Sequence, residues 1–250
     1  MTSNIPQKTA AASVGGRAPK ASRYRGRRDF LQAGAVLLAA LFAREPRDAR
    51  AAPGQEEKPR VIKLVAFGDS LTAGIFLPAD GSFPAVLEAA LRKEGYHVSI
   101  VNAGVSGDAT SGGLARLDWS LGEGADGLIL ELGANDMLRG TDPRVTRAAL
   151  DSILARLKEK NVKVLIAGML ASPSLGQAYR DEFDAIYPYL AAKYGALLYP
   201  FFLEGVSGHP QFTLTDGLHP NAAGVETIVR NILPTVRLLL ASLGDKPSGN

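Results

Sequence analysis

Residues 61–71 read VIKLVAFGDSL, the pattern of a buried strand that turns into a helix. Its first seven residues form a short apolar run rich in β-branched side chains, which is typical of a buried strand. Glycine, aspartate and serine follow at once, where such a strand would turn into a helix. Outward from this point, strand patterns alternate with helix patterns as far as residue 240.

The alternation predicts a parallel sheet covered by helices on both faces, because parallel strands need crossover connections. We expect one α/β domain over residues 61–242, without a second domain. In such a sheet the functional loops lie beyond the carboxyl ends of the strands, so site residues should follow strands directly. Further strands are predicted at 97–101, 127–132, 162–167 and 196–199, and helices at 83–94, 144–160, 180–194 and 222–240.

The first fifty residues have the composition of an export signal. The 11-residue apolar run 33–43 is too short to span a bilayer but fits the core of a signal peptide. The segment Ala49-Arg50-Ala51 then gives the small-x-small pattern of a cleavage site. Before the apolar run, Arg27-Arg28-Asp29-Phe30-Leu31 resembles a twin-arginine export signal. An N-terminal membrane anchor, an amphipathic helix and export by the general secretory route are the alternatives.

We therefore expect residues 1–51 to be an export signal read by the export machinery, 52–60 a linker and 243–250 a flexible tail. The mature protein is then periplasmic or secreted, without stable membrane insertion. Ten of the 28 basic residues but only three of the 25 acidic ones lie in residues 1–51. The positive net charge thus belongs to the predicted signal, and the remainder is mildly acidic. This argues against a nucleic-acid partner, which needs a clustered basic surface.

The absence of cysteine from the chain excludes a cysteine nucleophile, a zinc-thiolate site and a lipid-modified cysteine anchor. It does not decide the redox compartment. No metal site is predicted, because Asp69, Asp108 and Asp136 are dispersed, and no cofactor is expected.

Candidate chemical groups follow the first three strands. Ser70 follows the first strand, at a turn where its hydroxyl can face the crevice. Its backbone N–H could there donate a hydrogen bond to an oxyanion. The sequence NAGVSG follows the second over 102–107, and Asn135 follows the third as a neutral amide donor. Taken singly, each has a plainer interpretation, as a helix cap, an ordinary loop or an Asx-turn.

The segment Asp216-Gly217-Leu218-His219-Pro220 supplies what a serine nucleophile needs. A serine hydroxyl is a poor nucleophile without a base, and histidine suits this role. A carboxylate on the second ring nitrogen fixes the tautomer and stabilises the imidazolium. The other histidines lack such a setting, since His97 lies within a strand pattern and His209 in a loop.

In order and spacing, Gly68-Asp69-Ser70-Leu71, Gly104, Gly133-x-Asn135-Asp136 and Asp216-x-x-His219 resemble the motifs of the SGNH, or GDSL, hydrolase family. The similarity covers about residues 60–242. Within the family, the chain is most similar to bacterial periplasmic thioesterase, lysophospholipase and arylesterase enzymes. The stretches that support this are residues 133–140, 185–188 and 199–202.

The resemblance implies a three-layer flavodoxin-like fold with five parallel strands in the order 2-1-3-4-5. It assigns Ser70 as nucleophile, His219 as base and Asp216 as its partner. The Ser70 and Gly104 N–H groups and the Asn135 side chain would form the oxyanion hole. The implied activity is hydrolysis of small carboxylic esters, thioesters or lysolipids through an acyl-enzyme.

The segment 171–177 differs from the periplasmic thioesterase, lysophospholipase and arylesterase group, which usually has a longer and more basic stretch at this place. The acyl chain-length preference of that group therefore does not carry over. This loop is expected to border the acyl pocket. Other candidates, for which plain packing is the alternative, are Leu71, Ile75, Phe76, Met137 and Leu138.

Three other interpretations of the sequence are a carbohydrate O-acetylesterase, a receiver-like signalling domain and a catalytically inactive binding protein. A carbohydrate O-acetylesterase would use the same triad on acetylated sugars. A receiver-like signalling domain would need a lysine after the fifth strand, where Tyr199-Pro200-Phe201 stands instead. A catalytically dead binding protein is disfavoured because every catalytic position is filled.

Overall fold

The five strands of the sheet lie in the order β2-β1-β3-β4-β5, and all neighbouring pairs are parallel. The structure is a computed structural model that describes residues 60–247. Residues 1–51, most of the predicted linker and residues 248–250 lie outside the described part. The predicted order 2-1-3-4-5 is confirmed. The strands are β1 (Ile62–Gly68), β2 (Val98–Gly104), β3 (Gly127–Glu131), β4 (Lys163–Ala167) and β5 (Leu197–Tyr199).

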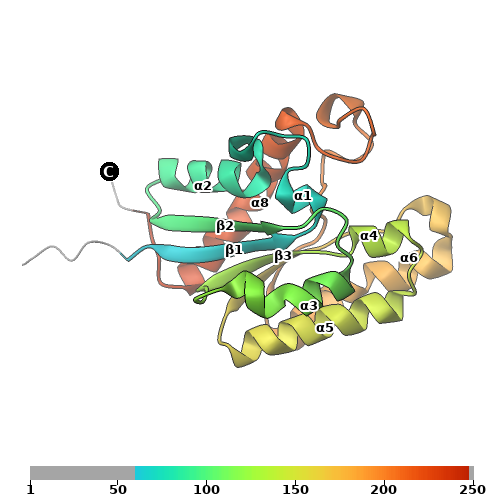
Figure 1. The fold of residues 1–250 in the computed structure, drawn as a ribbon, viewed down its shortest axis with the longest axis horizontal. Coiled ribbons are helices and arrows are strands. Elements are labelled where there is room, and N and C mark those ends of the chain that lie inside the picture. The colour runs from blue at the N-terminus through green and yellow to red at the C-terminus, as the bar shows by residue number, and fades with distance from the viewer. Residues whose placement is uncertain (1–59, 248–250) are drawn as a thin grey trace, which may run out of the picture. The chain divides into compact units, whose positions relative to one another are not determined.

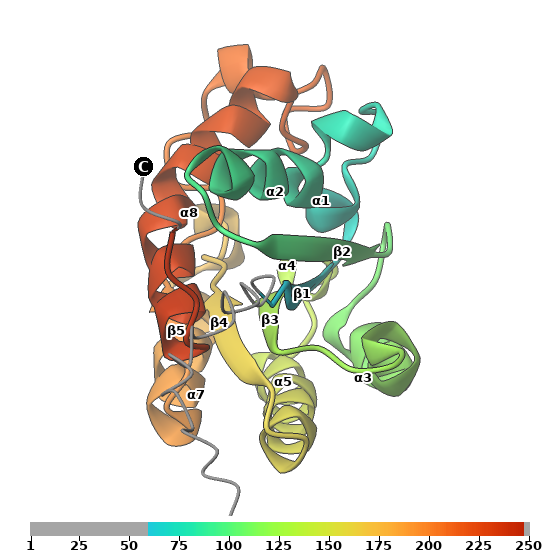
Figure 2. The ribbon, with the colours of Figure 1, turned by 90° about the vertical axis from the view of Figure 1, so that its left-hand side faces the viewer.

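Two layers of helices cover the sheet (Figures 1 and 2). One face carries α2 (Phe83–Lys93) and α8 (Ala222–Ser242). The other carries α3 (Thr110–Leu121), α5 (Pro143–Glu159) and α7 (Ile186–Tyr194). No helix of residues 60–247 has both the length and the apolar character needed to cross a membrane.

Short elements gather where the strands end. Figure 1 shows α1 (Ser70–Ala73) and α4 (Ala134–Leu138) beside the arrowheads of the strands, with α6 (Gln177–Asp184) next to α4. The short 3₁₀ helices are η1 (Ala79–Gly81), η2 (Pro173–Leu175) and η3 (Pro210–Phe212). The carboxyl end of the sheet is therefore where loops and helix starts meet.

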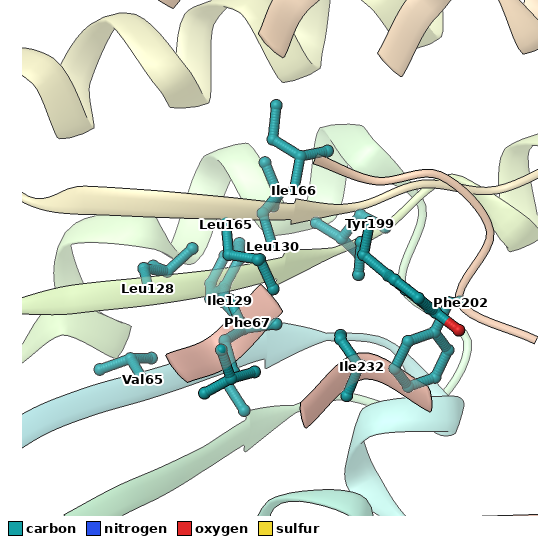
Figure 3. Close-up of a cluster of buried hydrophobic side chains, with 14 of the residues drawn as sticks. Val65, Phe67, Leu128, Ile129, Leu130, Leu165, Ile166, Tyr199, Phe202 and Ile232 are labelled. Carbon is teal, nitrogen blue, oxygen red and sulfur yellow. The ribbon is translucent and has the colours of Figure 1, made fainter. Parts of the chain in front are cut away.

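The core consists of the strands' apolar side chains and the helix faces that cover them (Figure 3). All five residues of β3 are buried, as expected for a central strand with both faces covered. Phe67 of β1 and Leu130 of β3 are almost completely shielded from solvent. This packing gives the strand ends a rigid base.

The helix α3 was not predicted. Gly112 and Gly113 interrupt its helical pattern, and glycine in a helix costs stability. The structure explains Gly113, since a Cβ there would overlap the Leu132 side chain. The helix lacks a side-chain cap from its own N-cap residue. Instead, the buried Asp136 accepts hydrogen bonds from the Thr110 N–H at 2.8 Å and the Thr110 hydroxyl at 2.7 Å.

Two predicted boundaries were wrong. The single helix expected at 180–194 is two helices, α6 and α7, that meet at Ala185. Pro188 lacks an N–H and therefore cannot donate to the carbonyl of Asp184, which favours a break there. In addition, β2 continues to Gly104, so the predicted loop after this strand starts later.

Asp136→Ala is expected to lower the free energy of unfolding by about 1–3 kcal/mol, because it leaves the buried Thr110 donors without an acceptor. Urea unfolding followed by circular dichroism measures this. The control is Ser152→Ala, since Ser152 is an exposed residue whose hydroxyl bonds only its own helix. Equal stability of the two variants would contradict the capping role of Asp136.

Candidate active site

Ser70 is the first residue of α1, directly after β1 and the turn residue Asp69. Asp69 is the N-cap of α1, and its Oδ1 accepts the Leu71 N–H at 2.9 Å. The plainer interpretation of this turn is thus correct for Asp69. The Ser70 hydroxyl, by contrast, faces the cavity described below, and the Ser70 N–H has no acceptor within residues 60–247.

The structure brings Ser70, His219 and Asp216 into one hydrogen-bonded chain. Ser70 Oγ lies 2.9 Å from His219 Nε2, and His219 Nδ1 lies 2.6 Å from Asp216 Oδ2. The other carboxylate oxygen of Asp216 accepts the N–H groups of Leu218 and His219. The hydrogen bond with the His219 side chain, and to a smaller extent the two backbone N–H bonds, lower the pKa of Asp216 to about 2. The carboxylate therefore stays ionised at neutral pH and favours a proton on His219 Nδ1.

Asn135 lies on α4, directly after β3, and its amide points toward the same turn. Its Nδ2 donates to Asp69 Oδ2 at 2.9 Å and to the Asp108 carbonyl at 3.0 Å. The preceding Gly133 has φ +122°, and a Cβ there would overlap the Tyr187 hydroxyl, which bonds the Leu132 carbonyl. Glycine at this position therefore sets the direction in which the chain enters α4.

Gly104 does not lie where the sequence suggested. It belongs to β2, its N–H donates to Asn102 Oδ1 at 3.0 Å, and it does not line the cavity beside Ser70. A Cβ at Gly104 would overlap the backbone of Ala73, so the glycine permits β2 to pack closely on α1. The geometry thus does not support the predicted oxyanion role of Gly104.

A buried carboxyl group that the sequence analysis missed lies under the serine turn. Glu131 ends β3 and is completely buried, and its Oε2 accepts from the Thr72 hydroxyl at 2.7 Å and the Asp69 N–H at 3.3 Å. Burial, with the nearby Asp69, raises the pKa of Glu131 well above its ordinary value. Burial also raises the pKa of Asp69. The protonated form of Glu131 is favoured, which avoids two adjacent negative charges.

The sequence analysis also missed Arg116, which lies on the unpredicted helix α3, and it considered Asp108 only as a possible metal ligand. Arg116 donates to the carbonyls of Gly68 and Ala103, each at 2.8 Å, and pairs with Asp108 at 2.6 Å. Its guanidinium lies 4.2 Å from the centroid of the Phe67 ring. One arginine thus ties the ends of β1 and β2 to the loop that Asn135 contacts.

A cavity of about 500 Å³ opens at Ser70, Asn135 and His219. Three of the predicted pocket residues, Leu71, Met137 and Leu138, line it, as does the start of the 171–177 loop. Neither Ile75 nor Phe76 lines it. Phe76 is an exposed side chain that approaches the His219 ring edge-on. Within residues 60–247, no group of three or more His, Asp or Glu side chains is arranged to hold a metal ion.

Residues 66–226 match the GDSL-like Lipase/Acylhydrolase family. The chain belongs to this family. The predicted family is confirmed, and with it the class of carboxylic ester hydrolases.

Three relatives illustrate the similarity. An arylesterase of Vibrio mimicus is 42% identical over 159 residues, which is 63% of this chain and 80% of that protein. A protein of Escherichia coli K12 named thioesterase 1/protease 1/lysophospholipase L1 is 40% identical over 159 residues, 63% of this chain and 75% of its own. The crystal structure of AlinE4, an SGNH-hydrolase family esterase, has 45% identity and a TM-score of 0.62 over 73% of this chain and 98% of that one.

Glu131→Gln is expected to change how stability depends on pH. Because the folded state raises the pKa of Glu131, the folded protein keeps a proton that the unfolded chain releases as the pH rises above about 4.5. Stability conferred by the protonated group is therefore complete at low pH and declines as the pH rises. A neutral glutamine removes this contribution. The free energy of unfolding, measured with urea at pH 5 and pH 8, should therefore fall less between the two pH values in the variant than in the wild type. The exposed residue Glu226, changed to Gln, is the control, and identical pH slopes in all three proteins would contradict a protonated Glu131.

Proposed function

We propose that the chain is a serine ester hydrolase in which Ser70 is the nucleophile, His219 the general base and Asp216 the group that orients it. The observation that carries this proposal is the hydrogen-bonded chain from Ser70 Oγ through His219 to Asp216, in which Ser70 and His219 line a cavity. A hydroxyl 2.9 Å from an imidazole nitrogen can transfer its proton as it attacks.

In the first half of the reaction, Ser70 Oγ attacks the ester carbonyl carbon and its proton passes to His219 Nε2. The carbonyl oxygen becomes a tetrahedral oxyanion. As this intermediate collapses, the bond to the alcohol or thiol breaks, and the leaving group takes the proton from His219. In the second half, water attacks the acyl-Ser70 carbonyl and gives a proton to His219. Ser70 is then released with its proton restored, together with the carboxylic acid.

Two donors near Ser70 suit the oxyanion. The Ser70 N–H lies at the start of α1, where the helix dipole favours negative charge. The Asn135 side chain is the second donor. Both of its hydrogen bonds go to protein acceptors, so one of them must break before the amide can donate to the oxyanion. The bond to the buried Asp69 holds the amide in place, so we propose that the bond to the Asp108 carbonyl is the one that breaks.

A third oxyanion donor is proposed at Gly107 in place of Gly104. Gly107 precedes Asp108, whose carbonyl contacts Asn135, and its φ of +83° suits a tight turn. Its N–H has no acceptor within the described residues. The Gly104 N–H, by comparison, is already bonded to Asn102.

The proposed substrates are small aryl esters, thioesters or lysolipids. The cavity is lined largely by apolar side chains and is larger than an acetyl group requires. This supports a medium-length acyl chain over the acetylated sugars of an O-acetylesterase.

Ser70→Ala is expected to lower kcat/KM for p-nitrophenyl esters by about 10⁴-fold or more, because the nucleophile is lost. Asn135→Ala should cost about 10²–10³-fold, the size of one oxyanion donor. The measurement uses esters from acetate to dodecanoate, beside acyl-CoA, a lysophospholipid and acetylated sugars. Ser207→Ala is the control, since this serine lines the same cavity and should keep most activity. Retained activity in Ser70→Ala would overturn the proposal, and activity confined to acetylated sugars would favour the O-acetylesterase.

We propose further that residues 1–51 export the folded domain to the periplasm or medium by the twin-arginine route. The support is the order of paired arginines, apolar run and cleavage pattern in the sequence. When the full chain is expressed in a Gram-negative bacterium and the cells are fractionated, the signal should be cleaved after about Ala51, so the mature chain should begin near Ala52 and be found outside the cytoplasm. Changing both Arg27 and Arg28 to Lys should retain the uncut chain inside. Export of this variant would contradict the twin-arginine route, and retention of the wild type would contradict export itself.

A further inference from the structure

The cavity beside Ser70 contains one permanently positive side chain, that of Arg180 on α6. The rest of the lining is mostly apolar, with serine hydroxyls and the Ser70, His219 and Asn135 groups. The only carboxylate of the lining, Asp69, is fully buried and already accepts two hydrogen bonds. A charged guanidinium in such surroundings needs an acceptor.

Within residues 60–247 the side chain of Arg180 makes no hydrogen bond, ion pair or cation–π contact, although its backbone N–H donates to the Gly176 carbonyl. Its Nε is buried without a partner. The other nine arginines of this part of the chain each have a partner. They are Arg60, Arg92, Arg116, Arg139, Arg144, Arg147, Arg156, Arg230 and Arg237. Leaving a buried donor of a charged group unpaired is costly, so this exception calls for an explanation.

The acidic residues of α6 do not neutralise Arg180. Asp181 accepts from Gln177 at 2.6 Å, and Asp184 accepts the Ala171 N–H at 2.8 Å. Glu182 lies on another surface of the helix, beside Arg144 and Arg147. The bond from Ala171 to Asp184 also ties the rim of the cavity to α6, which fixes the helix that carries Arg180.

We propose that Arg180 binds an anionic group of the substrate, so that the preferred esters carry a carboxylate or a phosphate on one of their two arms. A guanidinium matches both groups with paired N–H donors, and an apolar lining strengthens the attraction. The inference rests on the proposed ester hydrolysis and names the substrate class of the same site. It also gives the otherwise apolar cavity a means of orienting an ester relative to Ser70.

The test compares pairs of esters that differ in charge and little in shape. On the acyl arm, mono-p-nitrophenyl glutarate is paired with p-nitrophenyl 5-methylhexanoate, in which an isopropyl group replaces the carboxylate. On the leaving-group arm, 4-acetoxybenzoate is paired with 4-acetoxybenzamide. A third probe, 4-acetoxyphenyl phosphate, distinguishes a phosphate from a carboxylate preference. The wild type should prefer the charged member of at least one comparison, and added salt should weaken that preference.

Arg180→Gln should lower kcat/KM for the preferred charged ester by about 10- to 100-fold, mainly through KM, and leave its neutral partner within about twofold. Arg180→Met keeps an aliphatic side chain and should have the same effect on both esters. It replaces Arg180→Gln in the test if the glutamine variant folds poorly. Arg147→Gln is the matched control, because Arg147 does not line this cavity.

The inference is overturned if wild type shows no charge preference, or if both Arg180 variants affect charged and neutral esters equally. Neutral esters that are still hydrolysed in a Ser70-dependent way would, in that case, leave the proposed function intact. Failure to hydrolyse any of the esters would overturn the proposed function and this inference together.

Discussion

The buried side chain of Asp69 is the interaction on which the rest of the site depends. One of its oxygens holds the first turn of α1 through the Leu71 N–H, and the other holds the Asn135 amide. A single carboxylate thereby joins the turn after β1 to the turn after β3, two segments more than sixty residues apart in the chain. Since Ser70 follows Asp69 directly, the proposed nucleophile and the proposed oxyanion donor are held by the same carboxylate.

This anchor imposes a constraint on the residues below it. A carboxylate removed from water is costly unless hydrogen bonds stabilise it, and Asp69 receives two. Glu131 contacts the same turn, and its complete burial, together with the negative charge of Asp69, raises its pKa and accounts for the preference of Glu131 for its protonated form. Above the anchor, Asp216 stays ionised because it is exposed and bonded to His219. Three acidic side chains near one serine thus differ in protonation through burial and partners.

Local apolar patterns predicted the parallel sheet, and the rule that functional loops follow strand ends singled out Ser70 and Asn135. The strand order came from the resemblance to the SGNH family, and His219 was found from its spacing to Asp216. The sequence analysis missed α3, because Gly112 and Gly113 hide the helical pattern, although Gly113 is needed where the helix packs against the Leu132 side chain. Gly104 was assigned a place it does not occupy, because the end of β2 depends on pairing with β1. Arg180 and Glu131 could not be singled out, because their significance lies in missing partners and in burial, which only the folded structure reveals.

The central claim is that Ser70 forms a covalent acyl-enzyme. Mixing the protein rapidly with a p-nitrophenyl ester, quenching within milliseconds and locating the acyl group by peptide mass spectrometry tests it most directly. The expected result is a transient adduct of at most one acyl group per chain, on Ser70, and its loss in Ser70→Ala. An acyl group on another residue, or continued turnover without Ser70, would contradict it.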